Sequence, residues 1–202
     1  MEQRVCLRDT IFLRLDHASP LLCQVAADSF SQGLAHDLVV DGDFTRLFSV
    51  FRSEDVHVRQ SVIKELQNHI QRSDEAARRQ IVDAGILPEI LRAYTPAKDD
   101  LVDFLSTCVL PVLGPAFTQN NGGSSLFPFL TDGEPRIRAA AIQALKNVVD
   151  SHDMANAGVV EILHPLMVTD EAIRDLWCHI LPKMAPFLSN RVEIDILFES
   201  LK

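Results

Sequence analysis

The chain has 202 residues, of which 47% are apolar and 23% are charged. These proportions are those of an ordinary folded protein and exclude a wholly disordered or collagen-like chain. The formal net charge is −9, so a surface that wraps nucleic acid or an anionic membrane would act against the overall field. We therefore expect no direct binding of nucleic acid.

The four cysteines lie far apart and form no C-x-x-C pair: Cys6, Cys23, Cys108 and Cys178. This spacing is typical of reduced core cysteines in an intracellular protein. The first nine residues lack an apolar region of signal-peptide length. The most apolar stretch, Cys108 to Phe117, is about half of the ~20 residues that a membrane span requires. We expect a cytoplasmic or nuclear protein without a membrane span.

An apolar motif of the form [Leu/Ile]-[Phe/Leu]-x-x-[Phe/Tyr/Leu] recurs five times along the chain. Its copies are Leu47-Phe48-x-x-Phe51, Ile90-Leu91-x-x-Tyr94, Leu126-Phe127-x-x-Leu130, Ile162-Leu163-x-x-Leu166 and Leu197-Phe198-x-x-Leu201. Their starting positions differ by 43, 36, 36 and 35 residues, close to the ~40-residue period of helical repeats. The i, i+1, i+4 spacing predicts one buried stripe on a helix in each repeat.

A second apolar motif precedes each copy of the first. Its copies are Val25-Ala26-x-x-Ser29-Phe30, Val62-Ile63-x-x-Leu66, Leu105-x-x-x-Val109, Ala141-Ile142-x-x-Leu145 and Leu176-Trp177-x-x-Ile180. The distances to the following copy of the first motif are 22, 28, 21, 21 and 21 residues. The longest distance predicts an insertion at Gln71 to Gln80, in the form of an extended or extra helical turn that faces water.

Glycines stand between the two helices of most repeats: Gly42, Gly85, Gly122 with Gly123, and Gly158. Glycine enters a left-handed helix cap without a side-chain penalty, so we expect a turn at each. We predict one domain over residues 1–202, with a capping helix at 1–18 and repeats at 19–52, 53–97, 98–131, 132–168 and 169–202.

The residues around two of these glycines are similar to the armadillo-repeat signature, in which a helix ends at "x-x-Ala-Gly". They are Ile81-Val82-Asp83-Ala84-Gly85 and Met154-Ala155-Asn156-Ala157-Gly158. Glu134 to Ile142, with Pro135 at a first helical turn, also resembles the start of an armadillo or HEAT unit. The resemblance implies an all-α, right-handed superhelix of about five armadillo- or HEAT-like repeats. It also implies that the third helix of each repeat lines a concave groove that grips extended peptides.

Residues beside the first motif are the candidates for this groove: Arg46, Ser49, Glu89, Arg92, Ser125, Pro128, Glu161, His164, Ile196 and Glu199. The alternative is an ordinary solvated helix face. Positive charge comes early in this series, at Arg46 and Arg92, and negative charge comes late, at Glu161 and Glu199, with Glu89 as the exception. This order favours a partner with an acidic part near the first two repeats and a basic part near the last two. The asparagine ladder and groove tryptophans of nuclear-import receptors are not present. Trp177 and Asn147 both belong to the second-motif helices, and we expect Trp177 in the core.

The sequence contains no pattern that predicts catalysis, a metal or a cofactor. Cys178 and His179 are adjacent and point about 100° apart on a helix, and no second ligand follows at i+4. Gly122-Gly123-Ser124-Ser125 has no Lys-Ser/Thr after it, so it reads as a linker in which Ser124 or Ser125 caps the next helix.

We predict a non-catalytic scaffold that binds a partner protein or peptide in its groove. The alternative is a HEAT-type subunit that binds through its edges and ends. The last motif copy ends one residue before Lys202. A natural chain that continues, or self-association of this end, would cover its apolar residues.

Overall fold

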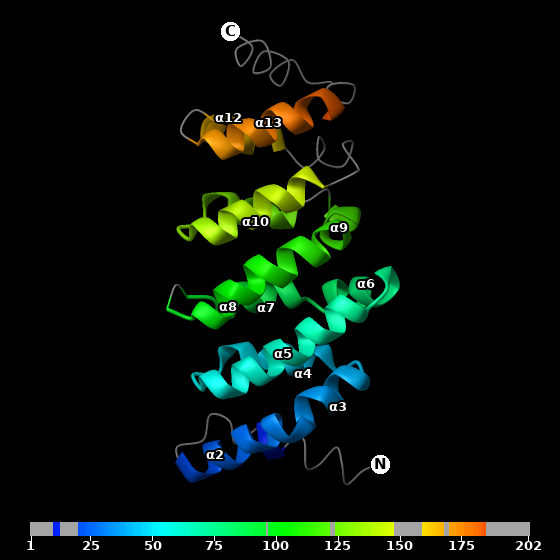
Figure 1. Ribbon diagram of the computed structural model, residues 1–202, viewed down its shortest axis with the longest axis vertical. Helices are drawn as coiled ribbons and strands as arrows, with labels where there is room; N and C mark the ends of the chain where they lie inside the picture. The colour runs from blue at the N-terminus through cyan, green and yellow to red at the C-terminus, as the bar shows by residue number, and fades with distance from the viewer. Residues whose placement is uncertain are drawn as a thin grey trace. The chain divides into compact units, whose positions relative to one another are not determined.

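The computed structural model describes residues 10–12, 20–95, 97–121, 124–147, 159–167 and 170–184. Every regular element in these ranges is helical (Figure 1), which confirms the all-α prediction. The chain divides into two compact units, Met1–Phe104 and Leu105–Lys202, here called the N-terminal and C-terminal halves and described separately. The predicted repeat boundaries stay a prediction, and the predicted capping helix lies almost wholly outside the described residues.

The N-terminal half is built from two layers of helices. Its elements are α2 (Pro20–Ser29), η1 (Phe30–Leu34), α3 (Ala35–Val40), α4 (Phe44–Ser49), η2 (Val50–Arg52), α5 (Val56–Arg72), α6 (Glu75–Asp83), α7 (Ile86–Ala93) and α8 (Asp99–Phe104). In one layer α3 packs on α5 and α5 packs on α8, while in the other α4 and η2 pack on α7. Figure 1 shows α5 in front of α4, and α8 in front of α7. The first layer thus contains α3, α5 and α8, the second contains α4 with η2 and α7, and α6 packs on α7.

Two of the predicted glycine turns are present. Gly42 has φ 70° just before α4, and Gly85 has φ 86° and is the residue from which α7 starts. A residue with a Cβ would be strained at both positions, because this is the left-handed region. At each position the glycine therefore ends one helix and sets the direction of the next. Gly122, Gly123 and Gly158 lie outside the described residues.

The segment Gln71 to Gln80 was predicted to be an extended or extra helical turn. That prediction is wrong, because the segment contains the end of one helix and the start of another. Helix α5 ends at Arg72, and a separate helix, α6, starts at Glu75. Asp74 caps α6, because its carboxylate accepts a hydrogen bond of 2.9 Å from the backbone nitrogen of Ala77. The Arg78 side chain donates from Nε to the carbonyl of Ile70 at 3.2 Å, which ties the new helix to the end of α5.

The register of the first motif on α7 was predicted one turn too late. Leu91 is 40% exposed, whereas Ile86, Leu87 and Ile90 are buried. The buried copy of the motif is therefore Ile86-Leu87-x-x-Ile90, which starts 39 residues after Leu47 and 40 before Leu126. This register shortens the distance from Val62 to 24 residues, so most of the apparent insertion disappears.

The core of the N-terminal half also contains a chain of aromatic contacts. Phe44 stacks on Phe48 at 6.0 Å between ring centroids, and Phe48 stacks on Phe51 at 5.9 Å. Phe51 then contacts Phe104 of α8 at 6.0 Å. Phe48, Phe51 and Phe104 are fully buried, so α4 and η2 are held firmly and their outer faces are placed by this packing.

The C-terminal half repeats the two-layer arrangement. Its elements are η3 (Leu105–Val109), α9 (Leu110–Asn121), η4 (Ser124–Thr131), α10 (Pro135–Lys146), α12 (Val159–Met167) and α13 (Glu171–Met184). Helix α10 packs on α9, η4 and α13, and α12 packs on α13 and η4. Pro135 occupies the first turn of α10, as predicted. Gly114 of α9 lets α10 approach closely, since a Cβ built there would lie 3.0 Å from the Cβ of Ala144.

Most described residues of the two motifs are buried in the C-terminal half, including Leu105, Leu126, Leu145, Leu163 and Trp177. The burial of Trp177 confirms that it belongs to the core. The cysteines behave differently from one another. Cys108 is buried as predicted, but Cys178 is exposed, so its assignment to the core was wrong. The last motif copy and Cys6 lie outside the described residues.

One helix in the described part of the chain, Asp99–Phe117, is long and apolar enough to span a membrane by length and composition. It has 19 residues, more than the short apolar stretch noted in the sequence, because the helix begins before Cys108. Of its most apolar window, 61% is buried inside the protein. A core helix of a folded domain has the same properties.

Candidate protein-interaction surface

Two segments of successive repeats, α4 with η2 and α7 with the two residues that follow it, present side chains to solvent at matching positions. Counted from Gly42, the exposed residues are the third, seventh and tenth: Thr45, Ser49 and Arg52. Counted from Gly85, the same three positions hold Pro88, Arg92 and Thr95, which are also exposed. The second and fifth positions are buried in both helices. Because α4 with η2 packs on α7, these side chains form one surface, here called the α4–α7 face, which also includes Arg46 and Glu89 at the fourth position.

A carboxylate bridges two arginines on the α4–α7 face. Arg52 donates from Nη2 to Oε2 of Glu89 at 2.6 Å, and Arg92 donates from Nη1 to Oε1 of the same carboxylate. The Glu89 side chain is 20% exposed, whereas those of Arg52 and Arg92 are 55% and 63% exposed. Glu89 therefore lies beneath the two guanidinium groups, and both of its oxygens are engaged.

Arg46 and Ser49 complete the described part of the predicted site. Arg46 Nη1 lies 3.4 Å from Oδ2 of Asp43, and both side chains are about one-third exposed. The Ser49 hydroxyl donates to the carbonyl of Arg46 at 2.6 Å, so its own helix uses its proton. The surface thus brings together three arginines and two carboxylates, a local positive excess on a chain of net charge −9.

Sequence reasoning missed Arg52. The candidates were chosen just before the first motif and two residues after its start, and Arg52 lies beyond that window. A helical count of three from Ser49 would have found it. Its contact with Glu89 joins residues 37 positions apart, and no local pattern predicts such a pair.

The predicted site residues of the C-terminal half are less completely described. His164 is half-buried on α12, and Pro128 is exposed on η4. Glu161 lies on α12, but its side chain is not among those described, and Ile196 and Glu199 lie outside the described residues. Ser125 does not cap a helix, because its Oγ is buried without a hydrogen-bond partner. The predicted acidic end of the groove therefore stays a prediction.

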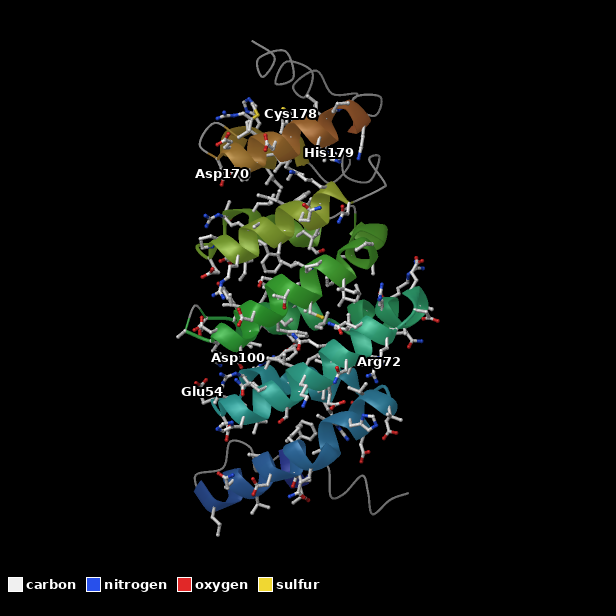
Figure 2. All side chains as sticks on the ribbon, in the orientation of Figure 1. Glu54, Arg72, Asp100, Asp170, Cys178 and His179 are labelled. Atoms are coloured by element: carbon white, nitrogen blue, oxygen red, sulfur yellow. The ribbon has the colours of Figure 1, made fainter. Side chains whose placement is uncertain are left out.

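The described residues offer little for catalysis or metal binding. They contain no group of three or more His, Cys, Asp or Glu side chains that could hold a metal ion. Cys178 and His179 are exposed neighbours on α13 (Figure 2), and Nε2 of His179 lies 3.1 Å from Nζ of Lys183. Hydrogen bonds from Arg136 lower the pKa of Glu134, which belongs to the cap of α10 and not to the α4–α7 face.

No family model and no curated protein matches this sequence. Solved structures do match its fold. An engineered protein from a structural genomics consortium has a TM-score of 0.52 and 19% identity, covering 88% of this chain and 78% of its own. A second engineered protein has a TM-score of 0.50 and 18% identity, with coverages of 94% and 84%. A designed armadillo repeat protein in complex with the peptide (KR)4 has a TM-score of 0.50 and 15% identity, with coverages of 94% and 85%.

Identities this low establish the fold and nothing beyond it. The three similar proteins are engineered or designed, and one is an armadillo repeat protein by its own description. The all-α elements, the glycine turns and the two buried motifs agree with that likeness. The chain has an armadillo-like repeat fold.

Proposed function

We propose that this chain is a non-catalytic scaffold that binds a partner protein or an extended peptide on the α4–α7 face. One observation carries the proposal: two neighbouring segments of successive repeats expose side chains at the same three positions after their glycines, while the second and fifth positions are buried in both. An exposed surface of this kind repeats at the spacing of packed helices, roughly 8–10 Å. An extended peptide repeats its side chains on one face about every 7 Å, so successive side chains can meet successive helices.

The likeness to a peptide-bound designed armadillo protein supports this function. That protein holds a peptide on an armadillo repeat fold, and the present chain has the same kind of fold. Repeat folds of this type commonly use their extended surfaces for binding. We also propose that the protein acts in the cytoplasm or nucleus.

A second candidate function is a HEAT-type subunit of a larger assembly that binds through edges and ends. Exposed apolar residues away from the α4–α7 face favour it. Leu21 is 73% exposed and Val25 is 49% exposed on α2, and Val40 at the end of α3 is 69% exposed. Association through the C-terminal end belongs to the same candidate.

Affinity capture from lysate followed by mass spectrometry would supply a partner, and charge reversal would then locate its site. The test variant is Arg46→Glu with Arg92→Glu. The matched control is Arg72→Glu with Arg79→Glu, which changes the charge equally. Arg72 is exposed at the end of α5 (Figure 2), and Arg79 is exposed on α6. At low salt the test variant should bind the captured partner at least tenfold more weakly than the control does.

Equal affinities of the two variants would contradict binding on the α4–α7 face. Loss of binding on replacing Leu21 and Val25 with Ser would then support the edge-binding subunit. Circular dichroism and melting curves should show that all of these variants stay folded, since none of the changed side chains is buried.

A further inference from the structure

We propose that the α4–α7 face selects an acidic segment, and that Glu89 occupies part of the site in the free protein as an internal substitute for a partner carboxylate. The inference rests on the proposed function and deepens it, because it names the partner class and the residue that tunes its affinity. The charge order of the groove candidates already favours an acidic part at this end, but neither the sequence motifs nor the fold likeness identifies the role of Glu89.

The geometry of Glu89 is that of a bound acidic side chain. It is held from two different helical elements, by Arg52 at the end of η2 and by Arg92 on α7. Both of its oxygens accept from guanidinium groups, as a partner carboxylate would be expected to do. Its low exposure, 20% against 55% and 63% for the arginines, places it below the surface that a partner would touch.

The arginines retain capacity for a second acidic group. Each guanidinium carries five N–H donors in a planar fork, and each uses one nitrogen on Glu89. The remaining donors belong to side chains that are more than half exposed. An incoming carboxylate can therefore bind the outer edges of Arg52 and Arg92 while Glu89 keeps their inner edges in place.

The opposite charge class fits poorly. A Lys/Arg peptide would bring its cations among Arg46, Arg52 and Arg92, and it would have to compete with two arginines for Glu89. Charges elsewhere on this acidic chain do not change this preference much at physiological salt, because screening limits their reach to about 8 Å. The designed neighbour binds the basic peptide (KR)4, so the two proteins should have opposite preferences.

Removing the internal carboxylate provides a sharp test. In Glu89→Gln the side-chain shape and one oxygen are kept, but the negative charge that repels an incoming carboxylate is lost. The variant should bind an acidic peptide more tightly than the unmodified protein does. The expected gain is about two- to fivefold, the range for an exposed charge pair.

The probes are three labelled peptides of equal length: Glu alternating with Ala, Gln alternating with Ala, and Lys alternating with Arg. Fluorescence anisotropy with the full chain should show preference for the Glu peptide by about tenfold or more over the other two. Arg52→Gln with Arg92→Gln should weaken Glu-peptide binding at least tenfold, while the control Arg72→Gln with Arg79→Gln should leave it unchanged. Preference for the Lys/Arg peptide, or weaker Glu-peptide binding by folded Glu89→Gln, would overturn the proposal.

The test separates this inference from the proposed function. If the captured partner requires the α4–α7 face but no Glu peptide binds it, the acidic class is wrong and the scaffold stands. If the captured partner ignores charge reversal on this face, the proposed site itself fails. Glu89→Gln conserves size at a partly exposed position, and its melting curve provides the check on folding.

Discussion

Arg59 of α5 and Asp100 of α8 form a buried, two-pronged ion pair. Nε of Arg59 donates to Oδ2 of Asp100 at 2.8 Å, and Nη2 donates to Oδ1 at 3.1 Å. The two side chains are only 6% and 8% exposed. Arg59 also donates from Nη1 to the carbonyl of Ser53 at 2.6 Å, so one side chain fixes the loop before α5 and the contact with α8.

Breaking this pair from one side should destabilise the protein strongly. Asp100→Asn should lower the free energy of unfolding by about 3–5 kcal/mol, because it leaves the Arg59 charge buried without its partner. Urea unfolding followed by circular dichroism measures the loss. The double variant Arg59→Met with Asp100→Leu should lose less than Asp100→Asn, and a larger loss in the double variant would contradict the argument.

The corrected register of α7 can be tested with two adjacent residues. Ile90→Ala should cost about 2–5 kcal/mol, because a fully buried side chain leaves a cavity. Leu91→Ala should cost under about 1 kcal/mol, because Leu91 is 40% exposed. Chemical unfolding of both variants measures the two losses in free energy of unfolding. Equal losses would support the original motif register, Ile90-Leu91-x-x-Tyr94.

The close approach at Gly114 predicts an unfavourable Gly114→Ala substitution. Alanine favours helix over glycine by about 1 kcal/mol, but the new Cβ would lie 3.0 Å from the Cβ of Ala144. Overpacking of this kind costs about 1–3 kcal/mol, so after the helix gain we expect a net loss of up to about 2 kcal/mol. Gly133→Ala is the matched control, since a Cβ there meets nothing within 4 Å, and thermal melts should show little change for it.

Acid should weaken the start of α10. The hydrogen bonds from Arg136 hold the pKa of Glu134 below its ordinary value, so ionised Glu134 favours the folded state. That contribution is present above the unfolded-state pKa and is lost as the pH falls through the lower, folded-state pKa. An NMR titration of the Glu134 carboxyl should show the lowered pKa, and Arg136→Ala should move it upward. An unchanged titration in Arg136→Ala would reject this cause.

The sequence predicts the local features of this fold better than its long-range contacts. The positions of Gly42, Gly85 and Pro135 could be predicted from residue type alone. Glycine adopts the left-handed conformation that a turn needs, and proline fits the first turn of a helix, where its missing N–H is not required. The register at Ile90 was wrong because α7 is apolar on two adjacent turns, Ile86-Leu87 and Ile90-Leu91, and both fit one helical period. Only the packing of α7 against neighbouring helices shows which of these apolar residues are buried.

In the candidate site, too, the local features could be predicted and the long-range contacts could not. Arg46, Ser49, Glu89 and Arg92 follow from counting along a helix, and all four belong to the α4–α7 face. The role of Glu89 as a bridge could not be predicted, because Arg52 belongs to another repeat. Cys178 was misplaced because cysteine is so often buried that its residue type outweighed its position on the outer side of α13.

The glycine turns also define which residues can vary without cost to the core. Positions two and five after Gly42 and Gly85 are buried, and positions three, seven and ten are exposed. Substitutions at the exposed positions would change what the surface recognises and leave helix packing intact. A single residue inserted within α4 or α7 would instead rotate the side chains that follow it by about 100° and turn buried residues away from the core. Recognition in such a chain can therefore diversify by substitution at the exposed positions more readily than by insertion within these helices.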